Sequence, residues 1–200
     1  MAPVTQTLLI INVIGFFLQV SADPMMMANF ALWPLHTATA TGGELSFQPW
    51  QLVTYGFLHG GAAHLLFNMF ALYMFGSDLE HVFGGKRFTT YYLVSVITAA
   101  LAQLAVSAMS TSPPIPTVGA SGGVFGLLLG FGLYFPHRKV MLLFLPIPMP
   151  AWLFVTLYGA LELFLGVTGT QRGVAHFAHL GGMLGGYLTI LAWRTRFRSP

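Results

Sequence analysis

The chain has 200 residues, of which only 6% are charged and 56% are hydrophobic, and its mean hydropathy is +0.74. A soluble domain carries about 25% charged residues, so this chain lacks the polar surface that water requires and is expected to be an integral membrane protein. Its net charge of +3 comes from eight Lys and Arg residues in loops and a tail, which form no basic face for nucleic acid. The absence of cysteine excludes disulfides and thiolate metal sites.

The first apolar segment is residues 8–20, and we expect a transmembrane helix over residues 4–21. The alternative is a signal peptide, because Val20, Ser21 and Ala22 resemble a small-residue cleavage site, and residues 1–22 would then be removed. No Lys or Arg precedes the apolar run, which favours the transmembrane helix.

Residues 22–53 form a long loop that is rich in proline, methionine and aromatic residues. This composition is too apolar for an ordinary solvated loop. Trp33 and Trp50 suit the headgroup level of a bilayer, so the loop is expected to lie partly in the membrane interface.

Five further spans are predicted, each near the ~20 residues needed to cross the hydrocarbon core. Pro146, Pro148 and Pro150 should break any helix that begins at Val140, so residues 140–148 are expected near the interface. The prediction is an all-α membrane protein with six transmembrane helices in a single domain, residues 1–200. The five later spans lie at residues 55–77, 88–108, 119–136, 149–166 and 174–193.

Basic residues predict the orientation. With a cytoplasmic N terminus, seven of the eight Lys and Arg lie inside and only Arg172 lies outside. Both termini are therefore expected in the cytoplasm, and the second, fourth and sixth spans run from outside to inside. The inside residues are Lys86, Arg87, Arg138, Lys139, Arg194, Arg196 and Arg198.

The fourth predicted span begins with Ser121, set between small residues after a proline-rich loop. Gly122, Gly126 and Gly130 recur every four residues, so one helix face has almost no side chains and a neighbouring helix can approach it closely. Alone, this pattern is typical of a packing helix with an incidental serine, because GxxxG is common in membrane helices.

The sixth span supplies a partner for Ser121. His179 lies about five residues into it, at the outer level of the membrane where Ser121 also lies. Two glycine-faced helices are natural neighbours, and close contact would bring His179 within hydrogen-bond reach of Ser121. Histidine is the usual base for a serine nucleophile, although a lone buried histidine can also make a structural hydrogen bond. The small-residue ladders of the sixth span are Gly181/Gly185 and Gly182/Gly186.

His64 and Asn68 share one face of the second span, because they are four residues apart. Both can donate hydrogen bonds, and Ser121, in the first turn of its helix, has a backbone N–H without an intrahelical partner. Donors that converge on one point can stabilise a tetrahedral oxyanion. The alternative is a polar clamp between helices.

No third member of a catalytic triad is evident among the acidic residues, so the sequence predicts a Ser–His dyad. Only Glu162 lies within a span at the level of the site, and it could equally snorkel or make a structural bond. The roles of Glu162 and His176 stay open. The other acidic residues are Asp23, Glu44, Asp78 and Glu80.

Together these residues resemble the rhomboid family of intramembrane serine proteases over about residues 48–190. A Gly-x-Ser-Gly motif alone is weak, but the ordered set on alternate helices is specific. The matching motifs are Pro49-Trp50-Gln51-Leu52, His59-x4-His64-x3-Asn68, Glu80 with Gly84, Gly119-Ala120-Ser121-Gly122 and Ala178-His179-Leu180-Gly181-Gly182.

The resemblance implies a serine endopeptidase with Ser121 as nucleophile and His179 as general base. His64, Asn68 and the Ser121 backbone would form the oxyanion hole, and His59 would be structural. It also implies a six-transmembrane rhomboid-like bundle with a membrane-embedded first loop, a water-filled cavity that opens outward, and a fifth span that gates substrate access. No metal or organic cofactor is implied. The partners would be the lipid bilayer and transmembrane proteins with small residues near the cleavage site, cut near the outer membrane face.

Two positions depart from the family pattern. Gln51 stands where the family usually has arginine, so the anchoring of the first loop is in question rather than catalysis. Phe125 stands where some members carry a tyrosine packed on the catalytic histidine, which keeps the ring and loses the hydroxyl. Gly119 and Gly122, in the serine motif, match the family.

Two other functions compete with proteolysis. One is an inactive rhomboid-like scaffold, although such relatives generally lack the serine or the histidine. The other is a metal transporter that uses His59, His64, His176 and His179, although no intramembrane acidic pair accompanies them. An outward-facing site fits a multi-pass protein of a prokaryotic plasma membrane. The sequence gives neither the natural substrate nor the oligomeric state.

Overall fold

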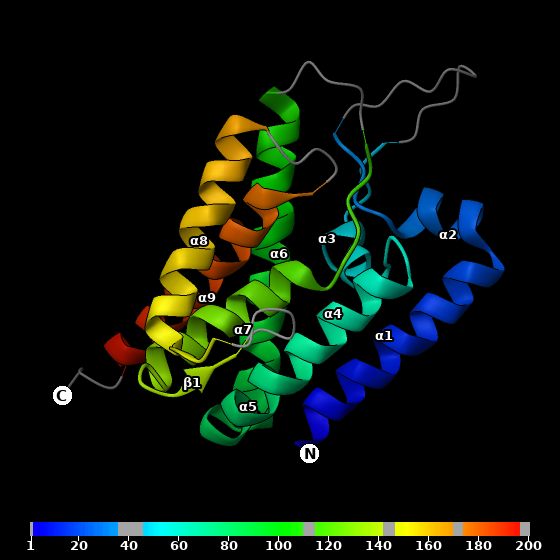
Figure 1. The fold of residues 1–200 in the computed structure, drawn as a ribbon. Helices are drawn as coiled ribbons and strands as arrows, with labels where there is room; N and C mark the ends of the chain where they lie inside the picture. Colours follow the sequence, from blue (N-terminus) through cyan, green and yellow to red (C-terminus); the bar gives the residue numbers. More distant parts are fainter. Residues whose placement is uncertain (1, 36–45, 110–114, 142–146, 170–173, 197–200) are drawn as a thin grey trace.

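The computed structural model describes residues 2–35, 46–109, 115–141, 147–169 and 174–196, and helices dominate it (Figure 1). A 3₁₀ turn at Tyr55–Phe57 follows the short helix Gln51–Thr54, and a π-helical segment at Leu72–Gly76 joins the helix Ala62–Ala71 to the helix Ser77–Phe83. The elements are α1 (Pro3–Ser21), α2 (Asp23–Phe30), α3 (Gln51–Thr54), α4 (Ala62–Ala71), α5 (Ser77–Phe83), α6 (Gly85–Met109), α7 (Ser121–Tyr134), β1 (Lys139–Val140), β2 (Met149–Pro150), α8 (Ala151–Thr168) and α9 (His176–Arg196).

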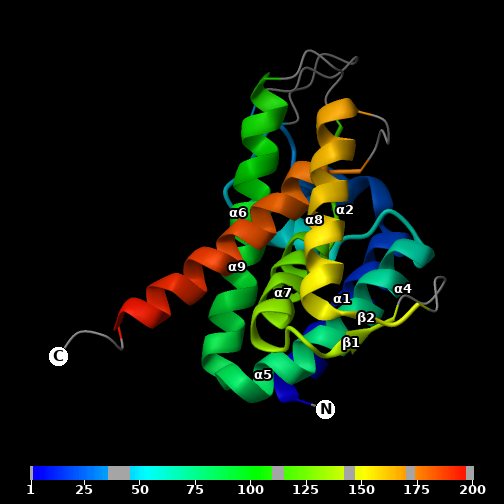
Figure 2. The ribbon, with the colours of Figure 1, turned by 60° about the vertical axis from the view of Figure 1, so that its left-hand side comes forward.

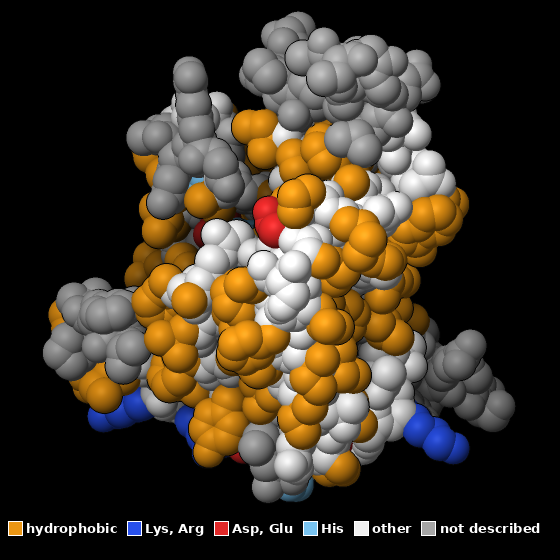
Figure 3. Space-filling view, turned by 90° about the vertical axis from the view of Figure 1, so that its right-hand side faces the viewer, with side chains coloured by type: hydrophobic (Ala, Val, Ile, Leu, Met, Phe, Trp, Pro, Cys, Tyr) orange, Lys and Arg blue, Asp and Glu red, His pale blue; other side chains and the backbone are white. Residues whose placement is uncertain are grey.

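The helices and their surface confirm an integral membrane protein. Among the residues that the structure describes, three helices, α1, α6 and α8, are long and apolar enough to cross a membrane, and α7 is a shorter apolar helix of 14 residues. Hydrophobic side chains cover much of the face in Figure 3, whereas the Lys and Arg side chains visible there lie at the end of the molecule where the N terminus lies in Figure 1. Apolar side chains such as Phe17 and Phe164 are largely exposed, as expected where lipid covers the protein.

Several helix boundaries differ from the bounds of the predicted spans. The helix expected over residues 55–77 begins at Ala62, because Gly61 before it has a non-helical φ of +156°, and it continues through α5 to Phe83. The charged residues near position 78 do not end a helix, whereas Gly84, with φ of +75°, does. The expected loop over residues 22–53 contains helix α2, and one short antiparallel pair, β1 with β2, departs from a purely α fold.

Helix α7 lies at the centre of the bundle, with α6, α8 and α9 on one side and α1 and α4 on the other (Figures 1 and 2). The predicted contact between glycine faces is confirmed, because a Cβ at Gly182 of α9 would overlap the carbonyl oxygen of Gly122. The Gly181/Gly185 ladder of α9 faces α6, where a Cβ at Gly185 would overlap the hydroxyl of Thr98. Small residues thus let α9 pack closely against two helices at once.

Two polar contacts hold α1 against the bundle. The buried carboxylate of Glu80 accepts hydrogen bonds from the backbone N–H groups of Val4 and Thr5, at 2.9 and 2.7 Å, and from the Thr5 hydroxyl at 2.8 Å. A negative group at a helix N terminus also interacts favourably with the helix dipole. At the other end of α1, Gln19 exchanges two hydrogen bonds of 2.9 Å with the backbone of His59.

Gln51 anchors the first loop without a charge. Its side chain is fully buried, and its Oε1 accepts hydrogen bonds from the backbone N–H groups of Trp33 and Gln48, each at 3.2 Å. Its Nε2 donates to the carbonyl of Asn29 at 3.2 Å. The neutral amide therefore joins three points of the loop, where an arginine could donate but not accept.

We predict that Gly182→Ala destabilises the bundle, whereas Gly159→Ala does not. The added Cβ at Gly182 meets backbone of α7, so the two helices must separate. At Gly159 of α8, the Cβ would lie 3.4 Å from the flexible side chain of Met183, an ordinary contact. Overpacking of the first kind costs about 1–3 kcal/mol, which thermal unfolding in detergent measures. Equal unfolding midpoints for the two variants would contradict the helix contact.

Candidate active site

The segment before α7 fixes the position of Ser121, which is the first residue of that helix. Leu32 and Thr117 pair through two backbone hydrogen bonds of 3.0 and 2.9 Å, and the N–H of Gly119 donates to the carbonyl of Tyr55 at 3.0 Å. Gly119 has φ of +131°, a conformation that L side chains rarely adopt, and a Cβ there would lie 2.8 Å from the ring of His64. Glycine at this position therefore lets His64 approach the start of α7.

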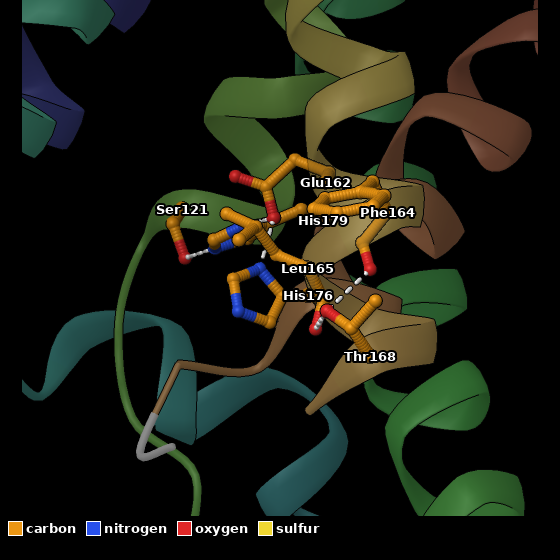
Figure 4. Close-up of polar contacts among 7 residues, drawn as sticks. All are labelled: Ser121, Glu162, Phe164, Leu165, Thr168, His176 and His179. Carbon is orange, nitrogen blue, oxygen red and sulfur yellow. Dashed lines mark hydrogen bonds and ion pairs between the residues drawn. The ribbon is translucent and has the colours of Figure 1, made fainter. Parts of the chain in front are cut away.

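His179 contacts Ser121 directly. Its Nε2 lies 2.9 Å from the Ser121 Oγ, and the two residues are 58 positions apart in the sequence (Figure 4). The ring of Phe125, one turn after the serine, stacks on the imidazole with the two planes only 4° apart and the centroids 4.1 Å apart. The histidine ring is thus held at both its edge and its face.

Glu162 of α8 approaches the other edge of the same imidazole. Its Oε2 lies 2.9 Å from the Nδ1 of His179 and 2.7 Å from the Nδ1 of His176 (Figure 4). All three side chains are buried. The sequence had left Glu162 and His176 without a role. The signals that could have found this contact are the three-residue spacing of the histidines and a lone carboxyl in the preceding span.

His64 and Asn68 lie on α4 and face the same cavity as Ser121 and His179. The Nδ1 of His64 accepts a hydrogen bond from the N–H of Gly60 at 3.2 Å. Asn68 is buried and donates one amide hydrogen to the carbonyl of His64 at 2.9 Å. Donor groups from α4 thus lie around the start of α7, although Asn68 bonds to its own helix.

His59 does not bond to the other site residues. It is buried, and its ring packs edge-on against that of His64 with the centroids 5.3 Å apart. Neither of its ring nitrogens has a hydrogen-bond partner among the residues that the structure describes. The contact is consistent with support of the His64 ring.

A cavity of about 770 Å³ runs from these polar residues between α4 and α8. Phe67, Phe70 and Met74 line it from α4 and the π-helical segment, and Phe154 and Tyr158 line it from α8. The cavity is therefore polar at Ser121 and apolar along most of its walls. Such a space fits an apolar chain that presents one polar group at the serine.

Glu162, His176 and His179 could offer three ligand atoms to a metal ion, all within 4.8 Å of one another. The distances between the Glu162 carboxylate and the two imidazoles are those of hydrogen bonds and are too short for two ligands of one zinc ion. Tetrahedral zinc holds its N and O ligands roughly 3.3 Å from one another, whereas the carboxylate oxygen lies 2.7 and 2.9 Å from the two nitrogens. The arrangement fits proton sharing better than metal ligation.

Comparison with known proteins identifies the family of the chain. Residues 46–196 match the Rhomboid domain. The chain is 33% identical over 140 residues to Rhomboid protein 1, mitochondrial, of Saccharomyces cerevisiae, an alignment that covers 66% of this chain and 38% of the relative. It is 32% identical over 145 residues to the Rhomboid protease GluP of Bacillus subtilis, which covers 72% of this chain and 26% of the relative.

A third relative aligns over nearly the whole chain. The Rhomboid protease AarA of Providencia stuartii is 26% identical over 205 residues, covering 94% of this chain and 72% of the relative. In contrast, the chain spans less than two fifths of the length of the yeast relative and about a quarter of GluP.

Proposed function

The chain belongs to the rhomboid family of membrane proteins, and on that basis we propose that it is a serine endopeptidase that cleaves transmembrane proteins within the bilayer. The observation that carries this proposal is the 2.9 Å contact between the Ser121 Oγ and the His179 Nε2 at the polar end of an apolar cavity. A nucleophile and a base within hydrogen-bond reach are what acyl transfer requires.

In the proposed reaction, the Ser121 Oγ attacks the carbonyl carbon of the substrate while its proton moves to the His179 Nε2. The carbonyl oxygen becomes an oxyanion. Collapse of this intermediate breaks the C–N bond, and His179 delivers the proton to the leaving nitrogen. Water then attacks the acyl ester in the same way and releases Ser121.

The proposed oxyanion hole combines the backbone N–H of Ser121 with the side chains of His64 and Asn68. This backbone N–H belongs to the first turn of α7, where an N–H group has no carbonyl acceptor within its own helix. An amide has two N–H donors, and Asn68 uses one for the carbonyl of His64, so the second is available to a substrate oxygen.

The proposed substrates are apolar helices that unwind at the site and carry small residues near the scissile bond. The apolar walls that α4 and α8 supply to the cavity support this class of substrate. An apolar transmembrane segment would find there surroundings as apolar as the lipid around it. The proposed topology has six spans in a single domain, with α4 and α5 joined in one span and α7 as the shortest. We place both termini in the cytoplasm, the first loop partly in the membrane, and the protein in a prokaryotic plasma membrane.

Serine-reactive labelling tests the proposal. The purified protein should react with a fluorophosphonate probe, and Ser121→Ala and His179→Ala should each abolish the reaction, because one removes the nucleophile and the other its base. Ser95→Ala, at a buried serine of α6 that bonds to the carbonyl of Tyr91, is the matched control and should keep the label. Labelling of the Ser121→Ala protein at the wild-type level would exclude the assignment.

Asn68→Ala should lower the rate of cleavage of a model transmembrane substrate by on the order of 10²–10³-fold, the usual loss for one oxyanion donor. The matched control is Asn29→Ala, because Asn29 also donates to the carbonyl four residues earlier but lies outside the cavity. Its rate should equal that of the wild type. If the Asn68→Ala protein is folded and cleaves at the wild-type rate, that side chain has no part in the oxyanion hole.

A further inference from the structure

We propose that Glu162 is a positioning residue for His179, so that the site is a Ser121–His179–Glu162 chain rather than a dyad. This inference rests on the proposed protease function and assigns a third member to the same site. It is based on two hydrogen bonds of 2.9 Å that one imidazole makes: its Nε2 accepts from the Ser121 hydroxyl, and its Nδ1 donates to the Glu162 carboxylate (Figure 4).

The carboxylate decides which nitrogen of His179 carries the proton. An ionised carboxylate accepts hydrogen bonds and cannot donate them, so the Nδ1 of His179 must carry the hydrogen. The Nε2 then presents its lone pair to the Ser121 hydroxyl, as a general base must. The other neutral tautomer would direct an N–H at the serine and could not accept its proton.

The same carboxylate stabilises the charge that forms during the reaction. When His179 takes the serine proton, it becomes an imidazolium in a site where it is 9% exposed and Glu162 is 4% exposed. With so little water nearby, a carboxylate at hydrogen-bond distance favours that cation more strongly than it favours neutral histidine. The interaction therefore grows as the transition state is approached.

The surroundings of Glu162 explain how a buried carboxylate is accommodated. A buried charge needs hydrogen-bond partners, and the Nδ1 of His176 supplies a second one at 2.7 Å. His176 and His179 are three residues apart, so they face α8 together. His176 also begins the 21-residue helix α9, and the N-terminal end of a helix favours negative charge.

Glu162→Gln tests the assignment with little change in shape. In the purified full-length protein, we expect the rate of fluorophosphonate labelling and kcat for a model transmembrane substrate to fall on the order of 10²–10⁴-fold, with KM unchanged. This is the range that a general base contributes, and a parallel fall in kcat and kcat/KM marks an interaction made in the transition state. Glu162→Asp, which keeps the charge on a shorter side chain, should recover part of the rate.

Glu80→Gln is the matched control, because Glu80 is equally 4% exposed and also bonds across helices, but to the start of α1. It should lower the thermal unfolding midpoint and leave kcat unchanged. Wild-type kcat in Glu162→Gln, or equal losses in Glu162→Gln and Glu162→Asp that follow their unfolding midpoints, would overturn the proposal and leave Glu162 as a structural clamp.

Two further arms separate the remaining outcomes. If the wild-type protein neither labels nor cleaves under conditions where it is folded, the protease function itself fails. If EDTA abolishes the wild-type rate and Zn²⁺ restores it, the Glu162, His176 and His179 cluster is a metal site, and the positioning role is overturned. Under the proposal, EDTA leaves the rate unchanged.

Discussion

The backbones of helices α7 and α9 nearly touch, and this close approach positions the polar side chains of the site. Ser121 lies on α7 and His179 lies on α9, and the hydrogen bond between their side chains forms only if these helices approach closely. Gly122 and Gly182 make that distance possible, because neither carries a Cβ to hold the backbones apart. The serine hydroxyl and the imidazole are thus brought together by packing between side-chain-free surfaces.

Polar groups fasten the helices around that central contact. In an apolar bundle an unpaired polar group is costly, and several buried polar side chains bond to another segment of the chain. Glu80 binds the start of α1, Gln19 binds the backbone of His59, and Gln51 joins three points of the first loop. Glu162 follows the same rule, but its partner is the histidine that contacts the serine.

The hydrogen bonds of Glu80 and Glu162 differ in whether the donor can change its protonation. At Glu80 the donors are two backbone N–H groups and the Thr5 hydroxyl, which keep their hydrogens at ordinary pH. At Glu162 one donor is an imidazole whose second nitrogen faces the Ser121 hydroxyl, so the proton position on one side of the ring affects the other side. The same motif, a buried carboxylate between helices, therefore fixes the fold at one end of the bundle and sets a tautomer at the other.

Much of the fold and part of the site could be predicted from the sequence. Composition determined the membrane class, four-residue glycine spacing determined which faces of α7 and α9 meet, and the His64–Asn68 spacing determined a shared helix face. These features follow from the fixed helical repeat of 3.6 residues per turn. The helix ends were predicted less accurately. The polar residues near position 78 are typical of the end of a span, but the helix continues through them.

The partner of each buried polar group was decided by the tertiary structure. Nothing in the spacing of Glu162 says that it reaches across to α9, or that its carboxylate meets both His176 and His179. The same is true of Gln51, whose side-chain oxygen accepts hydrogen bonds from two backbone N–H groups of the first loop. The sequence determines which side chains share a face of one helix, because the helical repeat is local. Which faces lie within about 3 Å of each other across helices depends on how the whole bundle packs.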